Sequence, residues 1–175
     1  PDLARLQARA LLRAAAHGPV SVLLPMVTLP SEPAAMAALF EEEAARLERQ
    51  GIAFARPPLG IMVEVPAVAL ALDLFTEAAF FSVGTNDLMQ YLAAAARDNP
   101  AVAHLYAGAE TAMFRLLEHI ATTARSVGRP VSLCGDIGGE PAALSRLIEM
   151  GLRDLSVAPT RLPALRAALG PRSEG

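Results

Sequence analysis

The feature that most constrains the fold is the alternation of short apolar runs with helix-length segments along the chain. The expected strands are residues 20–27, 60–65, 80–83, 131–134 and 155–157, and the expected helices are residues 2–17, 30–50, 66–76, 88–96, 110–127, 141–150 and 162–169. Strands that alternate with helices of this length pair in parallel through right-handed crossovers. The sequence therefore predicts an α/β protein, and periodicity alone leaves open whether the sheet is doubly wound or a (β/α) barrel.

The length of the chain limits the number of domains. With 175 residues, 53% of them hydrophobic, the chain is expected to form one domain over residues 1–175. It is shorter than the roughly 250 residues of a complete eight-stranded barrel. Residues 98–108 show no clear periodicity and are expected to form a loop.

Charge and cysteine content narrow the classes of partner. A net charge of -3 gives no broad basic field, so neither nucleic acid nor a membrane surface is an expected partner. The single cysteine forms no internal disulfide, the first residues lack the pattern of a secretory signal, and no apolar run is long enough to span a bilayer. A soluble, cytoplasmic protein is expected.

Functional side chains follow three of the expected strands. Glu64 ends one apolar run, Asp87 follows the next in a polar turn, and Cys134 ends a third. Because ligands bind at the carboxyl ends of parallel strands, we expect these groups to share one rim. Two neighbouring carboxylates repel each other and suit a hard cation such as Mg²⁺ or Mn²⁺.

Each of these residues also has a structural alternative that spacing leaves open. Glu64 could pair with an arginine at the end of its strand, and Asp87 could be the N-cap of the helix that follows. Cys134 could be a small buried hydrophobe. Arg97 could bind a carboxylate or phosphate at the same rim, or be a solvated cation near a helix C-terminus.

Several motifs together resemble one family. They are GIMVEVP at residues 60–66, FFSVGTNDLMQY at 80–91, RDNP at 97–100, HLY at 104–106 and LCGD at 133–136. In this order they closely resemble the phosphoenolpyruvate-binding domain of enzyme I of the phosphotransferase system, a phosphoenolpyruvate-protein phosphotransferase. The resemblance covers nearly the whole chain and implies the C-terminal portion of a (β/α)₈ TIM-type barrel.

The resemblance also implies a reaction and its residues. Glu64 and Asp87 would hold Mg²⁺, with Mn²⁺ as a substitute, while Asn86, the backbone at Asp87 and Arg97 would contact the substrate. Cys134 would protonate the methylene carbon of the pyruvate enolate after the phosphoryl group leaves for a histidine. The implied partners are phosphoenolpyruvate and pyruvate, a phosphohistidine domain, an HPr-like carrier protein and a second copy in a homodimer.

The sequence departs from the family pattern in three respects. None of its three histidines lies in the motif of the accepting histidine, the arginine-bearing barrel strands expected before residue 1 are absent, and Ser21 replaces a further arginine. We therefore expect a fragment that is nearly inactive alone, since each lost contact to a charged phosphate is worth about 1.5–3 kcal/mol. The alternatives are a domain of a phosphoenolpyruvate synthase or pyruvate phosphate dikinase, another enzyme of pyruvate or its enolate such as a barrel lyase, or a non-catalytic dimerisation module.

Overall fold

The protein is described by a computed structural model that covers residues 2–96 and 98–170. Its centre is a five-stranded parallel sheet made of β1 (Val22–Leu24), β2 (Leu59–Val63), β3 (Phe81–Gly84), β4 (Val131–Cys134) and β5 (Asp154–Ser156). The strands lie side by side in sequence order, and every pair is parallel. This order is that of consecutive strands in a (β/α) barrel, whereas a doubly wound sheet reverses its strand order at a switch point. The α/β class and the barrel-type arrangement are therefore confirmed.

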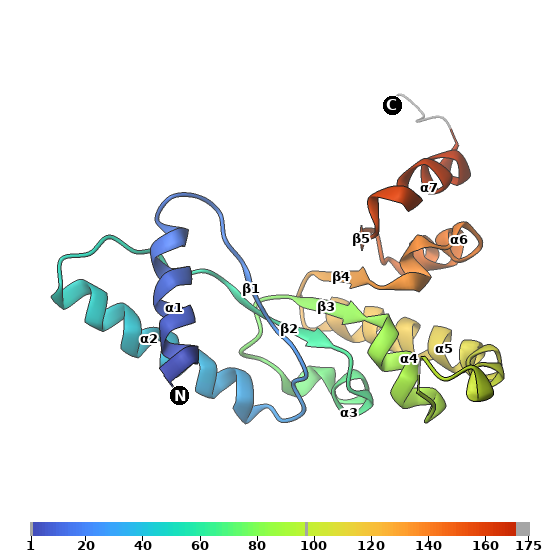
Figure 1. Cartoon of the computed structure of the whole chain (residues 1–175), viewed down its shortest axis with the longest axis horizontal. Helices are drawn as coiled ribbons and strands as arrows, with labels where there is room; N and C mark the ends of the chain where they lie inside the picture. The colour runs from blue at the N-terminus through green and yellow to red at the C-terminus, as the bar shows by residue number, and fades with distance from the viewer. Residues whose placement is uncertain (1, 97, 171–175) are drawn as a thin grey trace.

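Helices connect the strands and lie around the sheet (Figure 1). They are α1 (Asp2–Ala15), α2 (Ser31–Arg49), α3 (Pro66–Leu70), α4 (Thr85–Ala93), α5 (His104–Ser126), α6 (Pro141–Met150) and α7 (Leu162–Leu169), with short 3-10 helices η1 (Leu72–Leu74), η2 (Pro100–Val102), η3 (Asp136–Gly139) and η4 (Pro159–Arg161). In Figure 1, α1 and α2 lie together at one end of the molecule, and α6 and α7 lie at the other. No helix in the described part of the chain is both long enough and apolar enough to cross a lipid bilayer.

Several element boundaries differ from the expectation, and three of the differences concern the first strand, the long helix and the helix expected over residues 66–76. The first strand spans three residues rather than eight, because Pro25 has no N–H to donate and Met26 adopts a left-handed conformation with φ of 53°. The long helix begins at His104, six residues earlier than expected, because η2 leads directly into it after the Asn99 side chain accepts from the Ala101 N–H. The expected helix over residues 66–76 is divided at Ala71 into α3 and η1.

The main core determines which side chains face the functional side of the sheet. Ile61, Val63, Phe81, Val83 and Leu133 are buried in one apolar cluster with residues of α3, α4 and α5. Because side chains alternate along a strand, the intervening residues of β2, β3 and β4 face away from these helices. A register slip of one residue would move the functional groups into the core, so burial of this face fixes their orientation.

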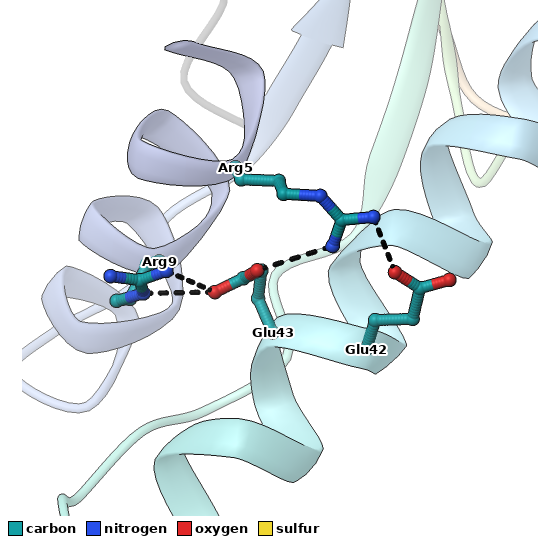
Figure 2. Close-up of polar contacts among 4 residues, drawn as sticks. All are labelled: Arg5, Arg9, Glu42 and Glu43. Carbon is teal, nitrogen blue, oxygen red and sulfur yellow. Dashed lines mark hydrogen bonds and ion pairs between the residues drawn. The ribbon is translucent and has the colours of Figure 1, made fainter. Parts of the chain in front are cut away.

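A second, smaller apolar cluster joins α1 to α2, and a charged group accompanies it (Figure 2). Glu43 is 2% exposed, and its Oε2 accepts a hydrogen bond from Arg9 Nε at 2.8 Å. Arg5 Nη1 lies 3.3 Å from Glu43 Oε1, while Arg5 Nη2 lies 2.7 Å from Glu42 Oε2. The hydrogen bond from Arg9 is the main cause that lowers the pKa of Glu43, and the bond from Arg5 adds to it.

Candidate functional site

The structure brings the three predicted strand-end residues to one end of the sheet. In the register of β3 and β4, Gly84 lies opposite Cys134, and Glu64 follows Val63, which lies opposite Val83. Asp87 lies in the first turn of α4, which begins directly after β3. The Asp87 carboxylate raises the pKa of the Glu64 carboxyl, and both carboxylates raise the pKa of the Cys134 thiol, so the three groups lie within electrostatic reach of one another. The expected common rim is confirmed for these three residues.

Glu64 is a buried carboxylate with one backbone donor. Its side chain is 3% exposed, and Oε1 accepts from the Met26 N–H at 2.7 Å. Burial is the main cause that raises the pKa of Glu64; the neighbouring Asp87 raises it further, while the Met26 N–H opposes the shift. No arginine among the described residues forms an ion pair with Glu64, so the structure does not support the arginine-paired alternative for this part of the chain.

Gly84 makes room for this carboxylate. A Cβ at position 84 would lie 2.9 Å from Glu64 Oε2 and 3.1 Å from Met62 Sδ. Both distances are shorter than ordinary van der Waals contact, so a side chain here would displace Glu64. A glycine in a strand often marks such a close approach, which is the sequence signal that could have identified Gly84.

Asp87 is not the N-cap of its helix. The cap residue of α4 is Gly84 and no side chain caps the helix, so the capping alternative is wrong. Asp87 instead projects from the first turn, where the partial positive charge of the helix N-terminus favours an anion. Asp87 therefore brings a second carboxylate next to the buried Glu64.

Two hydrogen bonds join the start of α4 to the turn after β4. The Thr85 hydroxyl, on a residue that is 1% exposed, donates to the Cys134 carbonyl at 2.9 Å. The Asp136 N–H donates to Asn86 Oδ1 at 2.9 Å, so the amide nitrogen is the group with which Asn86 could approach a phosphate. Gly135, with φ of 106°, lies so close to Thr85 that a Cβ would overlap its hydroxyl oxygen. These contacts fix the position of Cys134 relative to the carboxylates.

The Cys134 thiol is half-buried and its pKa is raised. Burial is the main cause, and the charges of Glu64 and Asp87 add to it, whereas a hydrogen bond from the Ser82 side chain lowers the pKa. A thiol with a raised pKa is protonated at neutral pH. Such a group suits proton donation better than nucleophilic attack, which requires the thiolate.

Arg97 lies outside the described residues, so its contact with substrate stays a prediction. Among residues 2–96 and 98–170, no group of three or more His, Cys, Asp or Glu side chains is arranged to hold a metal ion. Two carboxylates nevertheless fit Mg²⁺, which is commonly bound by one or two carboxylates together with water and substrate phosphate oxygens.

Fold and site together define a class of protein: a parallel α/β barrel-type chain whose strand ends carry a pair of carboxylates and a protonated thiol. Residues 1–173 match the family described as PEP-utilising enzyme, PEP-binding domain. The chain therefore belongs to the PEP-utilising enzymes, where PEP is phosphoenolpyruvate, and corresponds to their PEP-binding domain.

Curated relatives support this assignment and are much longer than the chain. A phosphoenolpyruvate-protein phosphotransferase of Geobacillus stearothermophilus is 43% identical over 171 residues, which are 96% of this chain and 29% of that protein. The phosphotransferase of Streptococcus equinus is 41% identical over 94% of this chain and 29% of its own length. Multiphosphoryl transfer protein 1 of Escherichia coli K12 is 40% identical over 95% of this chain and 20% of its own length. The chain thus spans less than a third of these relatives.

Solved structures show the same fold. A citrate lyase from Burkholderia xenovorans LB400 superposes with a TM-score of 0.68, at 23% identity, over 97% of this chain and 55% of that chain. A HpcH/HpaI aldolase/citrate lyase family protein from Burkholderia cenocepacia J2315 gives a TM-score of 0.55, at 18% identity, over 92% of this chain and 68% of that chain. At these identities the likeness concerns the fold alone.

Proposed function

We propose that this chain binds Mg²⁺ and phosphoenolpyruvate and supports transfer of the phosphoryl group to a histidine on another domain, with release of pyruvate. The observation that carries the proposal is the convergence of the Glu64 and Asp87 carboxylates with the Cys134 thiol at one end of the sheet. The names of the phosphotransferase relatives support the same reaction.

The two carboxylates are the proposed metal ligands. Burial raises the pKa of the Glu64 carboxyl and the neighbouring Asp87 raises it further, as expected of two acids whose like charges a bound cation would neutralise. When bound, Mg²⁺ would neutralise charge on the transferring phosphoryl group. Asn86 would offer its amide nitrogen to a phosphate oxygen, and Arg97 would supply a charge-assisted contact to the substrate.

Cys134 is the proposed acid. After the phosphoryl group has left for the histidine, the enolate of pyruvate holds an electron pair that is shared between its oxygen and its methylene carbon. The S–H bond of Cys134 breaks, a C–H bond forms at that carbon, and the sulfur keeps the electron pair as a thiolate until it regains a proton from solvent. The raised pKa of the Cys134 thiol keeps this proton available at neutral pH.

The wider setting follows from the same proposal. His17 follows α1, His104 begins α5, and His119 Nε2 lies 3.3 Å from the Leu70 carbonyl oxygen. We place the accepting histidine on a separate domain, with an HPr-like carrier as the next acceptor. A homodimer in the cytoplasm is the proposed working form, in which strands from the rest of the polypeptide complete the barrel.

The experiment is a titration of the chain with Mn²⁺ followed by electron paramagnetic resonance, with and without phosphoenolpyruvate. We expect phosphoenolpyruvate to tighten Mn²⁺ binding, and Asp87→Ala to abolish this effect because it removes one of two ligands. Asp73→Ala is the matched control, since Asp73 is an exposed acid on η1. Mn²⁺ binding that ignores phosphoenolpyruvate, or that survives Asp87→Ala unchanged, would refute the proposed function.

A further inference from the structure

The Glu64 carboxylate is held at one of its oxygens by a backbone group that follows the neighbouring strand. Met26, two residues beyond the end of β1, donates its N–H to Glu64 Oε1 at 2.7 Å. In a parallel ladder every second N–H of a strand points toward the same neighbour, and the Val22 N–H donates to the Pro58 carbonyl just before β2. In an extended chain the Met26 N–H would therefore also have a backbone carbonyl of β2 as its acceptor. It binds a side chain instead.

Met26 reaches this carboxylate with an unusual backbone conformation. Among residues 2–96 and 98–170, the non-glycine residues with positive φ are Met26, at 53°, and Ala94, at 49°. Ala94 is the C-cap of α4, a position where left-handed residues commonly end a helix. Met26 lies between β1 and α2 and ends no helix. A left-handed backbone is unfavourable for a residue with a Cβ, so its presence at Met26 needs another cause.

The contact with Glu64 supplies that cause, and the Met26 side chain does not. Met26 is 49% exposed, so its side chain gains little from packing at this position. Its N–H, in contrast, faces a carboxylate on a residue that is 3% exposed, and a buried carboxylate requires a hydrogen-bond donor. Strained residues of this kind occur at functional sites, where the surrounding structure holds them in place. The conformation of Met26 is therefore coupled to the Glu64 carboxylate.

The second oxygen of this carboxylate has a different environment. Glu64 Oε2 lies toward Gly84, where a Cβ would come within 2.9 Å of it. Gly84 is the last residue of β3, and α4, which carries Asp87, begins directly after it. One oxygen of Glu64 is thus bound by the backbone of Met26, while the other faces the segment that provides the second proposed metal ligand.

We propose that Met26 is a positioning residue for Glu64: its left-handed backbone directs the N–H onto Oε1, which fixes the carboxylate and leaves Oε2 as the oxygen for a divalent cation. The part that concerns the cation rests on the proposed function, whereas the hydrogen bond does not. Because the backbone makes this contact, the residue type at position 26 matters through its tolerance of a positive φ.

The first test compares two variants of Met26 in the Mn²⁺ titration followed by electron paramagnetic resonance, with phosphoenolpyruvate present. Glycine adopts a positive φ without a steric penalty, whereas a β-branched residue is strongly disfavoured there. We expect Met26→Val to bind Mn²⁺ about tenfold more weakly than Met26→Gly, the effect of losing a hydrogen bond to a charged group. Equal affinities, or tighter binding by Met26→Val, would show that the backbone conformation is not the cause and would overturn the proposal.

The matched control is the same pair of substitutions at Ala94, which has a similar φ but donates its N–H to the Tyr91 carbonyl. Ala94→Val should be less stable than Ala94→Gly in urea denaturation, because the same backbone strain applies. The two Ala94 variants should bind Mn²⁺ with equal affinity. A tenfold difference between them would show that backbone strain elsewhere weakens binding as much, and would overturn the role of Met26.

A second measurement needs neither the metal nor a variant of Met26. The exchange of the Met26 amide proton with solvent is followed by NMR in the wild-type chain. Because Met26 is 49% exposed, its amide would exchange rapidly without a partner, and the bond to Glu64 should slow exchange by about tenfold or more. Glu64→Leu removes the acceptor and should restore rapid exchange. Rapid exchange in the wild type, or slow exchange that persists in Glu64→Leu, would overturn the hydrogen bond.

The two measurements separate the inference from the proposed function. A slowly exchanging Met26 amide in a chain whose Mn²⁺ binding ignores phosphoenolpyruvate would overturn the proposed function and the cation part of the inference, but not the hold on Glu64. Mn²⁺ binding that phosphoenolpyruvate tightens, with equal affinities in Met26→Gly and Met26→Val, would overturn the role of Met26 alone.

Discussion

The ion pairs between α1 and α2 allow a test of how burial changes the contribution of a carboxylate to stability. Glu43 is buried and receives hydrogen bonds from Arg9 and Arg5, whereas Glu41 on the same helix pairs with Arg56 at the exposed surface. Glu43→Gln keeps the size of the side chain and removes its charge. Because Arg9 is partly exposed to water, we expect Glu43→Gln to lower the free energy of unfolding by about 2 kcal/mol, which is near the middle of the range for a hydrogen bond to a charged group.

The assay is urea denaturation followed by circular dichroism. With a slope of about 2 kcal/mol per molar urea, the loss corresponds to a midpoint lowered by about 1 M. Glu41→Gln is the control and should lower the midpoint clearly less, because the exposed pair interacts in water and is screened by salt. Equal midpoint shifts in the two variants would refute the argument that burial makes the Glu43 contacts stronger.

The stability difference between wild type and Glu43→Gln should also depend on pH. The pKa of Glu43 is lowered in the folded state, mainly by the hydrogen bond from Arg9, relative to the ordinary glutamate value of 4.5. A lowered pKa means that the stabilisation is present above the unfolded-state pKa and is lost as the pH falls through the folded-state pKa. The difference in stability between wild type and Glu43→Gln should therefore be constant near neutral pH and should shrink below about pH 4.5. A difference that grows on acidification would contradict this sign.

Further predictions concern the two glycines of the site and the hydroxyl that joins α4 to β4. Gly84→Ala should weaken Mn²⁺ binding in the resonance titration while the chain stays folded, because the new Cβ would displace the Glu64 carboxylate; unchanged affinity would show that Glu64 does not bind the metal. Gly135→Ala should lower the free energy of unfolding by about 1–3 kcal/mol, since it combines a positive φ with overlap against Thr85; a urea midpoint equal to that of wild type would refute the close contact. Thr85→Val keeps the shape of the side chain and removes the donor to the Cys134 carbonyl, so it should lower the free energy of unfolding by about 1 kcal/mol. A gain in stability would contradict the hydrogen bond.

The sequence was sufficient for the order of elements and for the identity of the strand-end groups. Glu64 and Cys134 each end an apolar run, and because the carboxyl ends of parallel strands meet at one edge of a sheet, this position in the sequence placed both at one rim. Element boundaries were less predictable. Residues 98–108 carried no periodicity, yet η2 leads directly into α5 at His104, and Tyr106 and Ala109 of this helix pack against the main core.

Tertiary structure alone decided how the site is held. The Met26 N–H reaches Glu64 across 38 positions of sequence, the Thr85 hydroxyl reaches the Cys134 carbonyl across 49, and the Asp136 N–H reaches Asn86 across 50. Separations of this size leave no local periodicity, because the partners meet only when parallel strands pair in a particular register. The sequence thus determined which chemical groups reach the end of the sheet, and the packing of the sheet determined which of them touch.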